Sequence, residues 1–164
     1  MTFRSKMILL LAALSASASS PLFAATTEET FAQNTREWIA AYNAGDVDTI
    51  VASYDEDAVV MPPDVPPANG HAAIRAFLVA DTKASKDAGI TLRIDSDSAG
   101  AGDDMGWHSG TFSVLDKDGK AVGTGKFLEV LQKKHDKWVI VRDIWNNDAP
   151  APAAAPAPAA PTQQ

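Results

Sequence analysis

The sequence predicts an α+β domain in which helices come first and a sheet follows. Apolar residues recur at helical spacing up to Gly89, and they alternate at strand spacing in four stretches after it. Short connections rich in Gly, Asp, Ser and Lys join these stretches, so neighbouring strands should pair antiparallel. We therefore expect one curved sheet with helices on one face.

The first helix is predicted to begin at a capping box formed by Thr26 and Glu29 and to end at Gly45. Its inward side has residues at helical spacing: Phe31, Thr35, Trp38, Ile39 and Tyr42. Asp46 can cap a second, shorter helix. The apolar side of that helix is expected to contain Val47, Ile50, Val51 and Tyr54.

A short strand over residues 58–61 should end at Pro62 and Pro63, since proline cannot donate to a strand ladder. After the loop 64–70, residues 71–86 predict a third helix ending near Gly89. The four later strands are expected over residues 90–95, 105–115, 121–134 and 137–146.

The two ends of the chain differ from the predicted domain, residues 25–148. Residues 1–24 have the order of a secretory signal: Arg4 and Lys6, an apolar run, then small residues. That run is too short to span a bilayer, so we expect a periplasmic or secreted protein without membrane insertion after signal cleavage. Residues 149–164 form an Ala/Pro tail that cannot bury a core.

Composition excludes several classes of function. The formal net charge is −7, and it becomes −9 when Arg4 and Lys6 leave with the signal, so nucleic acid is not an expected partner. The chain has no cysteine, and His71, His108 and His135 lack the spacing of a zinc site. No glycine-rich phosphate loop occurs. We therefore predict neither a metal nor a cofactor.

Three motifs resemble one family: WIAAYNAGDVDTIVASYDEDAVVMP (residues 38–62), GHAAIRAF (70–77) and WVIVRDIWN (138–146). They are similar to the nuclear-transport-factor-2-like superfamily, and within it to SnoaL-like and ketosteroid-isomerase-like domains. The resemblance implies a cone-shaped fold, with three N-terminal helices packed on a strongly curved, mainly antiparallel sheet around a pocket. It also implies homodimers that pair through the sheet.

The residues that carry the isomerase reaction are replaced. In the steroid isomerases the general-base aspartate precedes the proline that ends the first strand, and Met61 stands there. The oxyanion tyrosine corresponds to Trp38, whose N–H is a weaker acid, and the second oxyanion donor falls near Leu128. Ketosteroid isomerisation is therefore not expected.

Polar chemistry in the pocket is predicted to come from Asp143, His108 and Lys126. Strand alternation places Val139, Val141, Asp143 and Trp145 on one face, which the resemblance turns toward the pocket. Desolvation would raise the pKa of Asp143, Lys126 could pair with it, and His108 could carry a proton. Apolar pocket walls are expected from Trp38, Tyr42, Tyr54, Met61 and Trp145. Alternatively, Asp143 braces strand ends, His108 is structural, and Lys126 faces solvent on an edge.

Two functions follow from these predictions. The first is a pocket that binds a small apolar or aromatic molecule. The second is an isomerase, cyclase or hydrolase type of enzyme that uses Asp143 or His108 for proton transfer. Asp64, at the rim of the pocket, is a further candidate carboxylate.

Overall fold

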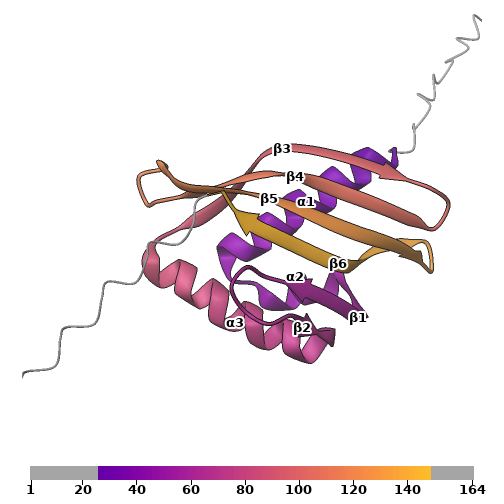
Figure 1. Ribbon diagram of the computed structural model, residues 1–164, viewed down its shortest axis with the longest axis horizontal. Helices are drawn as coiled ribbons and strands as arrows, with labels where there is room; N and C mark the ends of the chain where they lie inside the picture. The colour runs from indigo at the N-terminus through magenta and orange to yellow at the C-terminus, as the bar shows by residue number, and fades with distance from the viewer. Residues whose placement is uncertain (1–25, 149–164) are drawn as a thin grey trace, which may run out of the picture.

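The computed structural model describes residues 26–148, which form three helices and a six-stranded sheet (Figure 1). The helices are α1 (Thr27–Ala44), α2 (Val47–Ala52) and α3 (Gly70–Ala88). The strands are β1 (Tyr54–Met61), β2 (Ala68–Asn69), β3 (Thr91–Ala101), β4 (Met105–Leu115), β5 (Ala121–Lys134) and β6 (Lys137–Asn147). The predicted signal (residues 1–24) and the Ala/Pro tail (149–164) lie outside the described residues.

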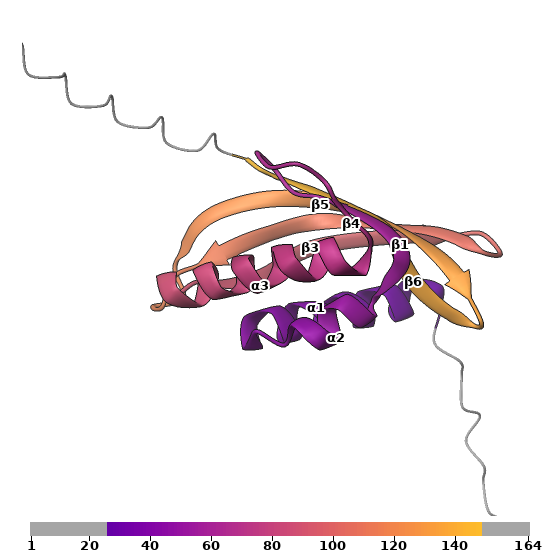
Figure 2. The same cartoon turned by 90° about the horizontal axis from the view of Figure 1, so that it is seen from below.

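The sheet has the order β2-β1-β6-β5-β4-β3 and does not close. Its pairs are antiparallel except for β1 and β6, which run parallel. The sheet bends over the helices, which all lie on one side of it, while its other face has no helix over it within residues 26–148 (Figure 2). The predicted α+β class, with three helices on a curved and mainly antiparallel sheet, is confirmed.

The helix ends follow the predicted chemistry. The Thr26 hydroxyl accepts from the Glu29 N–H at 3.2 Å, and the Glu29 carboxylate accepts from the Thr26 N–H at 2.8 Å. Gly45 and Gly89 end α1 and α3 with left-handed backbone, at φ of 76° and 66°. No helix between residues 26 and 148 has the length and hydropathy needed to cross a membrane.

Three boundaries differ from the prediction because pairing with another strand decides them. Tyr54 does not belong to the second helix, since it begins β1 and pairs with Ile140 of β6. Strand β3 continues to Ala101 because the small residues predicted to form a turn pair with β4. The loop 64–70 contains the short strand β2, which pairs with β1.

One irregularity in β6 determines which of its side chains face the helices. Leu131 pairs with Ile140, whereas the preceding residue Val130 pairs with Arg142, so Val141 has no partner in β5. This bulge turns both Ile140 and Asp143 inward, and both are buried. The predicted alternation, which placed Ile140 on the face opposite Asp143, was therefore wrong.

Candidate functional site

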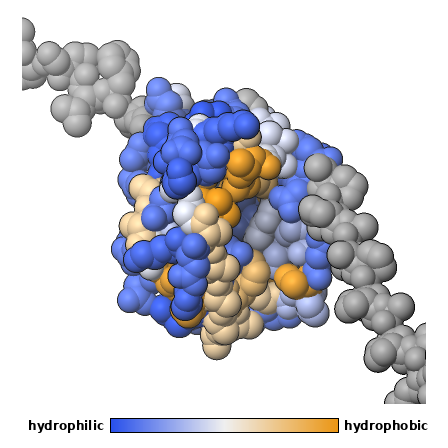
Figure 3. All heavy atoms as spheres, turned by 90° about the vertical axis from the view of Figure 1, so that its left-hand side faces the viewer, coloured by the Kyte–Doolittle hydropathy of each residue, from blue (hydrophilic) through white to orange (hydrophobic). Residues whose placement is uncertain are grey.

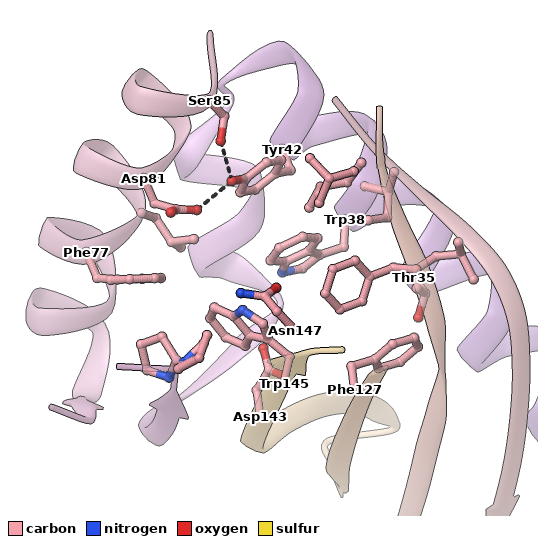
Figure 4. Close-up of a pocket in the computed structure, with 18 of the residues that line it drawn as sticks. Thr35, Trp38, Tyr42, Phe77, Asp81, Ser85, Phe127, Asp143, Trp145 and Asn147 are labelled. Carbon is pink, nitrogen blue, oxygen red and sulfur yellow. Dashed lines mark hydrogen bonds between the residues drawn. The ribbon is translucent and has the colours of Figure 1, made fainter. Parts of the chain in front are cut away.

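An open cavity of about 410 Å³ lies between the inner face of the sheet and helices α1 and α3. Its walls are mainly apolar, and they include Trp38, Phe77, Leu78, Phe112, Phe127 and Trp145 (Figure 4). Pro62 and Pro63, at the end of β1, also line it. The molecule is hollowed on this side, and hydrophobic side chains lie around the hollow (Figure 3). The volume is that of a site for a small organic molecule.

Asp143 lines this cavity from β6 and is 5% exposed. The hydroxyl of Tyr54, from β1, donates to its Oδ2 at 2.6 Å. Burial, and next the negative charge of Glu129, raise the pKa of Asp143 to about 8, although the Tyr54 hydrogen bond acts in the opposite direction. Asp143 therefore holds a proton near neutral pH and can donate a hydrogen bond.

Glu129 also lines the cavity, directly across from Asp143 in the pairing of β5 with β6. It is 7% exposed. Sequence reasoning missed this residue. A charged side chain between Phe127 and Leu131 in a strand was the available signal, because an acid in an otherwise inward-facing apolar row is unusual.

His108 is fully buried and does not line the cavity. Its Nδ1 lies 2.9 Å from the Thr35 hydroxyl and 3.4 Å from Glu129 Oε2, and its Nε2 lies 3.1 Å from Asp97 Oδ2. Burial alone would lower the pKa of His108, but the hydrogen bonds to Glu129 and Asp97 outweigh it and raise that pKa. His108 is thus linked to the cavity through its contact with Glu129.

Lys126 lies on the opposite face of the sheet, so its expected pairing with Asp143 was wrong. It is exposed, and its Nζ donates to Asp148 Oδ1 at 2.9 Å. The two-residue turn after β5 sets Lys134 opposite Lys137. If this register continued along the two strands without a break, Leu128 would lie opposite Asp143. The bulge at Val141 moves the pairing by one residue and brings Glu129 there instead.

Met61 also does not line the cavity, which corrects the prediction that it forms a wall. It pairs with Ile144 in the parallel ladder of β1 and β6, and Ile144 is exposed on the outer face. Leu128, opposite Ile144, is on that face too. Asp64 is exposed and does not line the cavity either.

The predicted aromatic residues have two different positions. Trp38, Tyr42 and Trp145 line the cavity, as Figure 4 shows. Tyr54 is behind Asp143 and is not part of the lining; burial, and next the charge of Asp143, raise its pKa well above the ordinary value. The Trp38 N–H is buried and has no hydrogen-bond acceptor among the described residues.

A second polar group lies at the α3 side of the cavity and was also missed. The Tyr42 hydroxyl donates to Asp81 Oδ2 at 2.5 Å and lies 2.8 Å from the Ser85 Oγ (Figure 4). Burial and the hydrogen bond to Asp81 raise the pKa of Tyr42, so it remains a neutral donor. Asp81 and Ser85 are four residues apart in α3, on the face that Phe77 shares, and this spacing was the available signal.

The described residues contain no group of His, Cys, Asp and Glu side chains arranged to hold a metal ion. The cavity combines an apolar interior, a carboxyl pair on the sheet, and a Tyr–Asp–Ser group on the helices.

Comparison with known proteins gives a family and a fold. Residues 35–141 match the model of the SnoaL-like domain family. A search of curated proteins found no match.

Solved structures with the same fold include an NTF2-like protein of unknown function from Pseudomonas putida KT2440, with 16% identity and a TM-score of 0.68 over 77% of this chain and 89% of that one. An NTF2-like protein with a cystatin-like fold from Novosphingobium aromaticivorans has 15% identity and a TM-score of 0.62 over 68% of this chain and 75% of that one. A ketosteroid isomerase-like protein from Erwinia carotovora atroseptica has 17% identity and a TM-score of 0.57 over 73% of this chain and 94% of that one.

Proposed function

Because this chain belongs to the SnoaL-like domain family, within the NTF2-like superfamily, we propose that its cavity binds a small, mostly apolar or aromatic molecule. The carrying observation is the open cavity of about 410 Å³ with aromatic walls and few polar groups. Asp143 supplies one of those groups. In its protonated form it offers a hydrogen bond to a carbonyl or hydroxyl oxygen of the ligand.

Binding is tested by titrating small aryl ketones and alcohols by calorimetry. Val114→Trp is the blocking variant, because Val114 lines the cavity and a larger side chain there reduces its volume. Binding to the wild type that is lost in Val114→Trp supports the proposal. Equal binding to both would place the ligand elsewhere and contradict it.

Proton transfer is a second candidate, favoured by one observation. Asp143 and Glu129 stand opposite each other on neighbouring strands, and the pKa of Asp143 rises to about 8 while His108 hydrogen-bonds Glu129. A carboxyl group with a raised pKa beside a second carboxyl at the same wall is an arrangement suited to general acid and base catalysis. Ketosteroid isomerisation itself is not proposed, since the position of its base is Met61, on the outer face.

This second candidate is tested with aryl ketones in D₂O, by measuring exchange of their α-protons by NMR. Proton transfer is supported if the wild type exchanges these protons faster than buffer does and if both Asp143→Asn and Glu129→Gln abolish that exchange. The matched control is Asp148→Asn, which removes a carboxylate that pairs with Lys126. Loss of exchange in that control would show that general charge effects, and not the carboxyl pair, are responsible.

We further propose a homodimer formed through the outer face of the sheet. Leu128 and Ile144 are opposite each other there, and each is 44% exposed, while Trp107 is 45% exposed. Large apolar side chains on a sheet face that no helix of residues 26–148 covers are typical of a protein–protein interface. Export rests on the order of residues 1–24 alone, and N-terminal sequencing of the mature protein from the native host tests it.

A further inference from the structure

Among residues 26–148, the lining of the cavity is acidic, and the basic side chain nearest to it, His108, contacts Glu129 from outside the lining. Asp81, Glu129 and Asp143 line it, and the described residues of the lining include no Lys, Arg or His. The full chain has a formal net charge of −7, so its overall field attracts cations and repels anions. A carboxylate or phosphate ligand would lose its water without gaining a cationic partner, which is unfavourable. The charge of the site thus favours cationic over anionic ligands.

Asp81 is the carboxylate best placed to receive a cation. It is half-buried, accepts the Tyr42 hydroxyl at Oδ2, and forms no ion pair with any residue in 26–148. Its Oδ1 has no hydrogen-bond donor in the same part of the chain. In Figure 4 the carboxylate lies beside the cavity, at the end where Tyr42 and Ser85 meet it. A ligand ammonium group could therefore donate to Oδ1 directly.

Aromatic rings surround this position. Trp38 and Tyr42 stack with ring centroids 5.3 Å apart, and Phe77 and Trp145 meet with centroids 5.9 Å apart. Phe77 is one helical turn before Asp81, and its ring lies on the same side of α3 (Figure 4). Faces of aromatic rings attract organic cations, and a carboxylate at the edge of an aromatic pocket strengthens that attraction.

We propose that the Tyr42–Asp81–Ser85 end of the cavity is an ammonium-binding subsite, and that the ligand is a small aromatic or apolar amine. This inference rests on the proposed binding function and names the chemical class of its ligand. The amine would contact Asp81, its apolar body would fill the space between the rings, and Asp143 would remain available to a second polar group.

Three probes of nearly equal size separate the possibilities: 3-phenylpropylamine, 3-phenylpropanol and 3-phenylpropionate, titrated by calorimetry at pH 7. We expect the amine to bind at least about tenfold more tightly than the alcohol, and the acid to show no binding. Asp81→Asn should weaken the amine about tenfold and change the alcohol by less than about twofold. The control Asp87→Asn removes a carboxylate from the same helix that pairs with Lys83 outside the cavity, and it should change neither.

The failures are distinguishable. If the alcohol binds as tightly as the amine, or Asp81→Asn leaves the amine unchanged, the ammonium subsite is refuted while the binding function stands. If none of the three probes binds, both are refuted. Should Asp81→Asn fail to fold, Phe77→Leu is the second variant, because it keeps an apolar side chain at this position but removes a ring face. It should weaken only the amine, and an equal effect on the alcohol would contradict the proposal.

Discussion

Replacing Asp143 with asparagine should make the protein more stable at alkaline pH. The asparagine side chain has nearly the same shape, and its carbonyl oxygen can accept the Tyr54 hydroxyl that now donates to Asp143 at 2.6 Å. It has no charge to desolvate. In the wild type, burial and the charge of Glu129 raise the pKa of Asp143 to about 8.

The sign follows from proton linkage. Between the ordinary aspartate pKa and about 8, the folded protein holds a proton on Asp143 that the unfolded chain has released. The free energy of unfolding of the wild type therefore falls as pH rises through this window, and it levels off above it. The full shift corresponds to about 1.4 kcal/mol per pH unit, or about 5–6 kcal/mol as an upper bound. Relaxation and coupling to Glu129 reduce this, so we expect a gain of about 2–5 kcal/mol for Asp143→Asn at pH 8.5.

Urea unfolding of both proteins between pH 4.5 and pH 9 measures this difference directly. The advantage of Asp143→Asn should be small at the acid end and should grow with pH. Glu129→Gln is the companion variant, because removal of its charge should lower the pKa of Asp143 and flatten the decline of the wild-type curve. A difference that stays constant across this range would show that Asp143 is not desolvated, and the reasoning would be refuted.

Two further predictions concern the sheet. A Cβ at Gly125 would lie 2.3 Å from the Phe112 ring, so Gly125→Ala should lower the free energy of unfolding by about 1–3 kcal/mol. Phe112 lines the cavity, and its movement should also weaken ligand binding. At Gly123, in the same strand, the atom nearest to an added Cβ is 3.6 Å away, so Gly123→Ala should change the free energy of unfolding by less than about 1 kcal/mol. Equal losses of stability for the two variants in thermal melts would contradict this argument. The wild type should sediment as the proposed dimer, and the double variant Leu128→Asp, Ile144→Asp should sediment as a monomer. Equal sedimentation coefficients for the two proteins would contradict an interface on this face.

Local chemistry in the sequence was sufficient for most of the fold. The capping residues Thr26 and Glu29, the helix-ending Gly45 and Gly89, and the turn before Lys137 each act within a few residues, so their effects can be read from the chain. The same applies to the inward position of Trp38 and Tyr42, which follows from helical spacing. The boundary at Tyr54 could not be predicted in this way, because its strand pairs with β6, far along the chain.

The sequence by itself determined an α+β domain with three helices and an aromatic-walled face, and the family resemblance of its motifs predicted Asp143 as an inward carboxyl group. Only the tertiary structure decided which groups stand beside that carboxyl. A single unpaired residue, Val141, shifts the register of β6 by one, and side chains of a strand alternate between faces with a period of two. Glu129 therefore meets Asp143 inside the cavity, while Lys126 faces outward and Met61 lies on that outer face with Ile144.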